Sequence, residues 1–281
     1  MYKSPALDDI RKRIDALDNE VHDRLLERAD LVMQISEEKK KNNIQIVQPA
    51  REARMIRRLI ARHREPLPEE TIVRIWRELV GSISLLQTGL SVSVFQGATN
   101  QKANNEYWDM ARDYFGSVLP MSRVLSTLEI LQDVNDDRVS FAVLPYPFHD
   151  DANPWWTALH TLPALKIIQR LPYGRKENFS FEDSPALVVA KAGFDTSDDD
   201  HSLILISATK DISRARIVES LQKIALDPIA LFAHEGYFLA EVKTYLSADD
   251  ERLKALQNYI NESEVRVMLA GGFPAPLHYK S

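Results

Sequence analysis

Residues 7–41 read LDDIRKRIDALDNEVHDRLLERADLVMQISEEKKK, a run that contains neither proline nor glycine. The apolar residues of this run recur at steps of three, four or seven, and on a helix they form one stripe: Leu7, Ile10, Ile14, Leu17, Val21, Leu25, Val32 and Ile35. At ~1.5 Å per residue the helix would be about 50 Å long, longer than a small domain is wide. We therefore expect it to pack against a second copy of the chain in a homodimer.

Two further helices are predicted within the first 90 residues. Pro49 is acceptable in a first helical turn and opens a second helix that reaches about His63. The stretch Glu65-Pro66-Leu67-Pro68 then ends that helix and starts a third. The third carries an apolar stripe of its own: Ile72, Ile75, Trp76, Leu79, Val80, Ile83 and Leu86.

From Val92 onward the periodicity changes to that of an α/β region. Short buried strands are predicted at 92–94, 141–145 and 187–190, with helices at 104–115 and 122–132 between them. The last 80 residues alternate as strand, helix, strand, strand, helix, strand, which is the ferredoxin-like order. We therefore expect three domains: an all-α domain at 1–90, an α/β domain at 91–200 and a ferredoxin-like α+β domain at 201–281.

Composition excludes several classes of protein. The 281 residues include no cysteine, so disulfides and thiolate zinc sites are ruled out. The start MYKSPALDD has no apolar signal region, and no apolar run approaches the roughly 20 residues that span a bilayer, so we expect a cytoplasmic protein without membrane contact. The seven histidines are scattered, and no glycine-rich phosphate loop occurs, so neither a metal nor a cofactor is expected.

Charge is distributed unevenly along the chain. Residues 1–90 hold 17 Lys and Arg against 15 Asp and Glu, whereas the remainder holds 18 against 26. The basic part alternates in sign along its helices and has few aromatic residues for base stacking, so we expect no binding of nucleic acid.

Selected cations occupy one face of the first helix. Arg28 and Lys39 are eleven residues apart, about three helical turns, and so point in the same direction. Arg51 and Glu52 open the second helix. Arg11 precedes Arg28 by 17 residues, roughly 25 Å along the axis, so both could reach one small ligand only if Arg11 came from another subunit. Each cation alone is typical of an ordinary surface charge in an i,i+4 pair.

Together, and in this order, these residues resemble the all-helical class of chorismate mutase over about residues 6–90. The matching elements are Leu7-Asp-Asp-Ile-Arg11-Lys-Arg-Ile-Asp15-Ala-Leu-Asp18, Leu25-Leu-Glu-Arg28-Ala, Lys39, Arg51-Glu52 and Gln87. The resemblance implies that three helices per chain intertwine with a second chain into a dimer. It also implies that each site takes one arginine from the partner's first helix, in agreement with the distance argument for Arg11.

The resemblance assigns a role to each site residue. Arg11 of the partner subunit and Arg28 would clamp the two carboxylates of chorismate, with Arg51 supporting them. Lys39 and Gln87 would donate to the ether oxygen, and Glu52 would take the substrate hydroxyl. Gln48 would be a further substrate contact, although it stands where the family often has an acidic residue. Ile83 likewise replaces a common serine, and both departures bear on affinity.

The rest of the chain resembles, more faintly, a prephenate dehydratase region with an ACT-type regulatory module. The matching elements are Val94-Phe-Gln-Gly97, Tyr114-Phe-Gly116, Phe141-Ala-Val-Leu-Pro145 and Val267-Met-Leu-Ala-Gly-Gly-Phe-Pro274. Residues 91–200 are too few for a two-lobed dehydratase, and Pro185-Ala186-Leu187 stands where the resemblance places a Thr-Arg-Phe motif. We therefore expect no dehydratase activity.

Two other functions fit parts of the pattern. The chain could be a non-catalytic regulatory or binding protein of the same pathway, a reading that the full set of cations and Glu52 disfavours. It could also be an isochorismate pyruvate lyase on the same helical scaffold, which product analysis with both substrates would distinguish.

Overall fold

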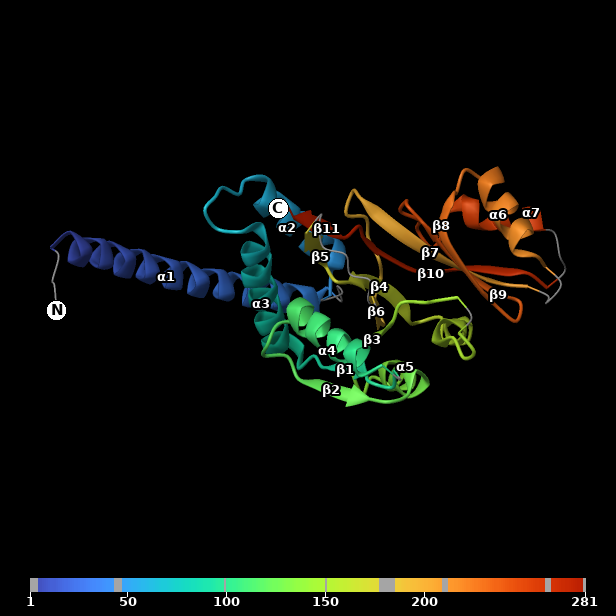
Figure 1. The fold of residues 1–281 in the computed structure, drawn as a ribbon, viewed down its shortest axis with the longest axis horizontal. Helices are drawn as coiled ribbons and strands as arrows, with labels where there is room; N and C mark the ends of the chain where they lie inside the picture. Colours follow the sequence, from blue (N-terminus) through green and yellow to red (C-terminus); the bar gives the residue numbers. More distant parts are fainter. Residues whose placement is uncertain are drawn as a thin grey trace.

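The computed structural model describes residues 5–42, 47–98, 100–149, 151–176, 185–208, 212–260 and 264–279. At positions 5, 83–88, 175 and 176 the description covers the backbone only. Within these ranges no helix combines the length and the apolar character needed to cross a membrane. Three helices come first in the chain, and a mixed α/β region follows them (Figure 1).

The three predicted N-terminal helices are confirmed as α1 (Pro5–Lys41), α2 (Pro49–Ala61) and α3 (Glu69–Thr88). α1 is one unbroken helix of 37 residues, and its N-terminal half projects away from the rest of the molecule (Figure 1). The apolar stripe on this projecting half is uncovered in the single chain: Leu17 is 59% exposed and Val21 is 58% exposed. Burial of such a stripe stabilises a helix, so the isolated chain leaves a large apolar surface in water.

The α/β region begins directly after α3. It contains, in chain order, β1 (Val92–Phe95), α4 (Gln101–Phe115), β2 (Met121–Val124), α5 (Thr127–Asn135), β3 (Phe141–Pro145), the 3₁₀ helix η1 (Trp155–His160), β4 (Lys166–Leu171), β5 (Gly174–Lys176), β6 (Ala186–Ala190), β7 (Asp200–Ser207), α6 (Arg214–Lys223), β8 (Pro228–His234), β9 (Tyr237–Val242), α7 (Glu251–Ile260), β10 (Arg266–Pro274) and β11 (Leu277–Tyr279).

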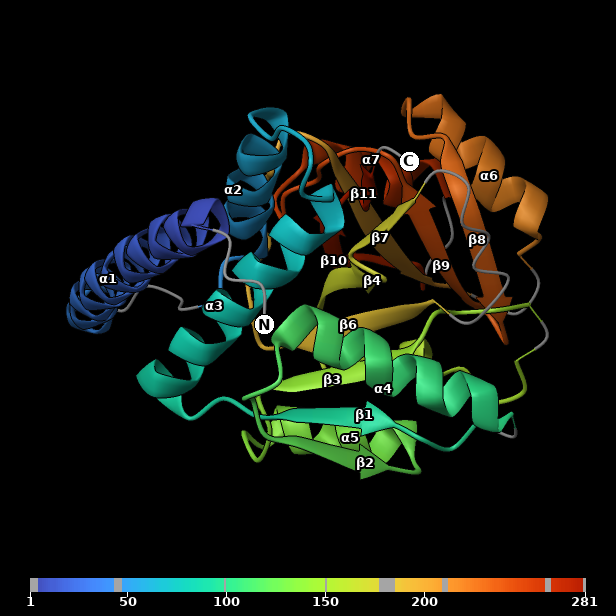
Figure 2. The same cartoon turned by 60° about the vertical axis from the view of Figure 1, so that its left-hand side comes forward.

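One sheet of nine strands runs through this region in the order β2-β1-β3-β6-β4-β10-β7-β9-β8. β1 pairs in parallel with β2 and β3, as the βα alternation of their sequence requires. Side chains alternate across β3: Phe141 and Val143 face α4, whereas Ala142 and Leu144 face α5 and η1. The two helices α4 and α5 therefore cover opposite faces of the same strands (Figure 2).

One predicted element was wrong. The helix expected at 122–132 is a strand, β2, followed by the shorter helix α5. Ser126 marks the boundary, because its hydroxyl accepts a hydrogen bond from the backbone N–H of Glu129 and so caps α5. The region from 145 to 172, in which no element was predicted, contains η1 and the buried strand β4.

The last segment forms four antiparallel strands in the order β10-β7-β9-β8, with α6 and α7 packed together on one face (Figure 1). β10 also joins β4 of the preceding region, where Gly271 pairs with Ile167. Gly271 has φ +140, and a Cβ there would lie 2.1 Å from the carbonyl oxygen of Ile167. Only glycine fits this close approach. The pairing of β10 with β4 joins the four C-terminal strands to the strands before residue 200 in one continuous sheet.

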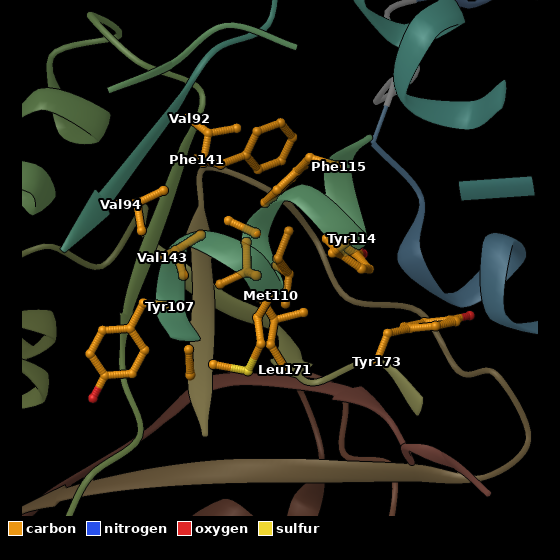
Figure 3. Close-up of a cluster of buried hydrophobic side chains, with 14 of the residues drawn as sticks. Val92, Val94, Tyr107, Met110, Tyr114, Phe115, Phe141, Val143, Leu171 and Tyr173 are labelled. Atoms are coloured by element: carbon orange, nitrogen blue, oxygen red, sulfur yellow. The ribbon is translucent and has the colours of Figure 1, made fainter. Parts of the chain in front are cut away.

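The helices and the α/β region share a hydrophobic core. Ile56 of α2 and Val73 of α3 belong to the same buried cluster as the α4 side chains. Figure 3 shows this cluster, with Tyr114 and Phe115 at the end of α4 packed among strand residues and Tyr173. The N-terminal helices are therefore anchored to the sheet, and only the outer part of α1 extends beyond it.

Candidate active site

Three cations from α1 and α2 lie close together. Arg28 and Lys39 are half-buried on one face of α1, and Arg51 is exposed in the first turn of α2. Burial, and after it the positive charge of Arg51, lowers the pKa of Arg28. The same two causes lower the pKa of Lys39, partly opposed by the negative charge of Glu52. The structure therefore brings together the predicted group of Arg28, Lys39, Arg51 and Glu52, in which positive charge is in excess.

Two buried polar atoms on this face of α1 have no hydrogen-bond partner among the described residues: Nη1 of Arg28 and Oγ of Ser36. Ser36 lies eight residues after Arg28 and three before Lys39, so the three side chains follow one helix face. A buried charged donor without an acceptor costs on the order of 1–3 kcal/mol or more. The arrangement is therefore suited to a ligand that supplies anionic acceptors.

Glu52 is held in place by Arg77 of α3. Nη1 of Arg77 donates to Oε2 of Glu52 over 2.6 Å, and the side chain of Arg77 is 4% exposed. Arg77 was not among the site residues predicted from the sequence, although a signal was present. It stands four residues after Val73 and four before Gly81, both of which are buried, so it lies on the inward face of α3.

The other predicted residues are placed as follows. Arg11 lies in the N-terminal half of α1, where it is exposed and forms an ion pair with Asp8 at 3.5 Å, far along the helix from Arg28. Gln48 precedes α2 and makes no side-chain capping bond, while its carbonyl accepts from the N–H of Glu52 over 3.1 Å. Gln87 lies in the last turn of α3, but its side chain and that of Ile83 are outside the described side chains.

Comparison with known proteins gives a family for this part of the chain. The profile of the family Chorismate mutase type II matches residues 10–88. This stretch contains all the site residues that were predicted on the three helices. A bifunctional chorismate mutase/prephenate dehydratase of Aquifex aeolicus (strain VF5) is 27% identical over 143 residues, which is 50% of this chain and 38% of the relative. The matches to three such bifunctional proteins span between 37% and 40% of their lengths.

Two solved structures superpose on about two thirds of the chain. A chain described as GqqA, a novel type of quorum quenching acylases, superposes with a TM-score of 0.47 at 14% identity, covering 66% of this chain and 95% of that one. A prephenate dehydratase from Streptococcus mutans superposes with a TM-score of 0.43 at 9% identity, covering 68% of this chain and 98% of that one.

The alignment with the Aquifex relative covers half of the chain and so extends beyond residues 10–88. The profile match and the grouping of Arg28, Lys39, Arg51 and Glu52 concern the same three helices. The N-terminal helices of this protein are therefore a chorismate mutase type II domain, followed by a mixed α/β region.

Proposed function

We propose that the chain converts chorismate to prephenate at the cluster formed by Arg28, Lys39, Arg51 and Glu52. The observation that carries the proposal is the buried Nη1 of Arg28, a charged donor without a partner among the described residues. It lies in a region where burial, and after it the positive charge of Arg51, lowers the pKa of both Arg28 and Lys39. A dicarboxylate would supply the missing acceptors and offset the repulsion among the three cations.

The chemistry suits a site of this composition. The reaction is a unimolecular rearrangement in which a C–O bond breaks while a C–C bond forms, with no proton transfer and no external reactant. Catalysis then comes from holding the reactive conformer and stabilising the charge that grows on the ether oxygen. Arginine and lysine donors in a partly desolvated site can do both.

Each residue has a proposed role. Arg28 binds a substrate carboxylate, with Arg51 and Gln48 at the rim of the site, and Ser36 adds a buried hydroxyl on the same helix face. Lys39 donates to the ether oxygen, and Gln87 is proposed to act with it from α3. Oε1 of Glu52 accepts a hydrogen bond from the substrate hydroxyl, because Oε2 already accepts one from Arg77.

The site is proposed to be completed by a second subunit. The exposed apolar residues of α1, among them Ile10, Ile14, Leu17 and Val21, offer a surface that a second α1 would bury. Arg11 lies on that same half of the helix, too far from Arg28 to serve the site of its own chain. A homodimer through α1 would supply the partner's Arg11 to each cluster.

We further propose that the α/β region makes no phenylpyruvate from prephenate. Ala186 is wholly buried in β6, which pairs with β3 on one side and β4 on the other. The carbonyl of Pro185 accepts from the N–H of Tyr146 over 2.8 Å. Pro185 and Ala186 therefore contribute to the hydrogen bonding and packing of the sheet. Neither side chain has a hydroxyl or a cation that could assist the elimination of water and carboxylate.

The organisation of the remainder belongs to the same proposal. We assign a helical domain to 1–90, a shortened dehydratase-like domain to 91–200 and an ACT-like domain to 201–281. The strand order β10-β7-β9-β8 with both helices on one face supports a ferredoxin-like fold for the last part. The cysteine-free composition agrees with a cytoplasmic location.

The decisive experiment follows the loss of chorismate absorbance with purified full-length protein in the presence of EDTA. Turnover well above the uncatalysed rate is expected, with prephenate as product. Arg28→Gln should abolish most of it, whereas the matched variant Arg24→Gln should not, because the Arg24 side chain, one turn earlier, is 80% exposed and pairs with Glu27. No turnover would refute the assignment and favour a regulatory protein, and release of pyruvate from isochorismate alone would identify a lyase.

A further inference from the structure

The C-terminal end of α4 is held by side chains of α3. Glu78 accepts two hydrogen bonds from Ser117, one from its backbone N–H at 2.8 Å and one from its hydroxyl at 2.5 Å. Nε of the neighbouring Arg77 donates to the carbonyl oxygen of Tyr114, three residues before Ser117, over 2.6 Å. That carbonyl is among the last four of the helix, which lack intrahelical partners, and it lies at the negative end of the helix dipole.

Arg77 connects this helix end to Glu52. The guanidinium carbon of Arg77 lies over the ring of Tyr114, 3.8 Å from the ring centre, and 5.4 Å from the ring centre of Tyr173. Nε and Nη1 belong to one rigid plane, so fixing Nε on α4 also fixes the direction in which Nη1 meets Glu52. The position of the Glu52 carboxylate is therefore tied to an element of the α/β region.

Among the described residues, Arg77 lines one small cavity. The cavity beside it, lined by Glu52, Tyr114 and Phe115 among others, has a volume of about 30 Å³. Ligand sites measure on the order of 300 Å³ or more, so this cavity has room for little more than a water molecule. The contact of Arg77 with the site residues is its hydrogen bond to Glu52.

We propose that Arg77 is a positioning residue for Glu52, and that the end of α4 thereby completes the mutase site from outside the helical domain. The inference rests on the proposed mutase function. In this chain the α/β region supports catalysis through the path Tyr114, Arg77 and Glu52. The contact also explains why an arginine is buried at a position whose neighbours on the inward face of α3 are Val73 and Gly81.

The test is a double-mutant cycle on the full-length protein with Arg77→Met and Glu52→Gln. Arg77→Met should lower kcat/KM by roughly tenfold to a hundredfold, the size expected for a misplaced reacting group. In a chain that already carries Glu52→Gln, the same change should have almost no further effect. A purely structural role would instead multiply the two losses, and that result would overturn the proposal.

Controls separate this proposal from folding defects and from the function itself. Glu78→Gln disturbs the same helix junction without touching Glu52, so it should lower the urea midpoint of unfolding while leaving kcat/KM within about twofold. If Arg77→Met does not fold, Arg77→Lys replaces it in the cycle, because one ammonium cannot make both fixed contacts. Wild-type protein that lacks mutase turnover refutes the proposed function, whereas an active wild type with multiplicative losses refutes only the role of Arg77.

Discussion

Gly81 of α3 lies against the carbonyl oxygen of Phe115 in the last turn of α4, so closely that a Cβ on Gly81 would stand 1.9 Å from that oxygen. Such a distance cannot be accommodated unless one helix moves, because the opposing atom belongs to the backbone. The helical domain and the α/β region thus meet at a contact that only a glycine permits.

Gly81→Ala should therefore destabilise the protein. Alanine in place of glycine within a helix normally stabilises by about 1 kcal/mol. Here the clash should outweigh that gain and lower the free energy of unfolding by roughly 1–3 kcal/mol, as overpacking does. Urea unfolding of the full chain measures the effect, with Ser82→Ala on the next position as the control. A more stable Gly81→Ala protein would show that the two helices can separate at no cost.

The activity should fall at a pH below the ordinary lysine range. Lys39 donates only while protonated, and burial together with Arg51 lowers its pKa from 10.5. The donor is lost as the pH rises through this lowered pKa, so the alkaline limb of kcat/KM should lie below pH 10.5. Arg51→Gln removes one lowering cause and should move that limb upward, whereas Arg58→Gln, an exposed arginine on the same helix, should leave it in place. An unmoved limb in Arg51→Gln would contradict the assignment to Lys39.

Subunit mixing tests the origin of Arg11. Lys39→Ala should lower kcat by about a hundredfold to a thousandfold, the value of a donor aimed at developing charge. Arg11→Ala and Lys39→Ala chains, each nearly inactive, should regain about a quarter of the wild-type sites after equal mixing, since half of the dimers then hold one intact site of two. Native mass spectrometry would establish that chains have exchanged. Exchange without recovery of activity would place Arg11 outside the site.

Prephenate should not be consumed by the chain. Incubation at neutral pH followed by a phenylpyruvate assay should give no product beyond that of buffer alone, because Pro185 and Ala186 offer neither hydroxyl nor cation and are built into the sheet. Acid treatment of the same solution, which aromatises prephenate, serves as the positive control. Formation of phenylpyruvate at a rate comparable to mutase turnover would reveal a working dehydratase.

Local pattern was enough to predict the three helices and the shared face of Arg28 and Lys39. Both follow from the 3.6-residue period of the helix, which a sequence displays directly. The separation of Arg11 from Arg28 is likewise a matter of helix rise per residue. For the same reason the apolar stripe on α1 could be recognised from the sequence.

The tertiary structure decided which surfaces of the helices and strands pack against one another. Glu52 and Arg77 are 25 residues apart, and Tyr114 is 37 residues beyond Arg77, so no local period connects them. The strand β2 was mistaken for helix because its burial is set by a neighbouring strand, β1, and by its place at the edge of the sheet. The order in which β10 inserts between β4 and β7 depends on Gly271 meeting Ile167, a fit between distant surfaces. The face of a helix on which a residue lies follows from short-range spacing in the sequence. Strand partners and buried ion pairs instead depend on which surfaces come together when the chain folds.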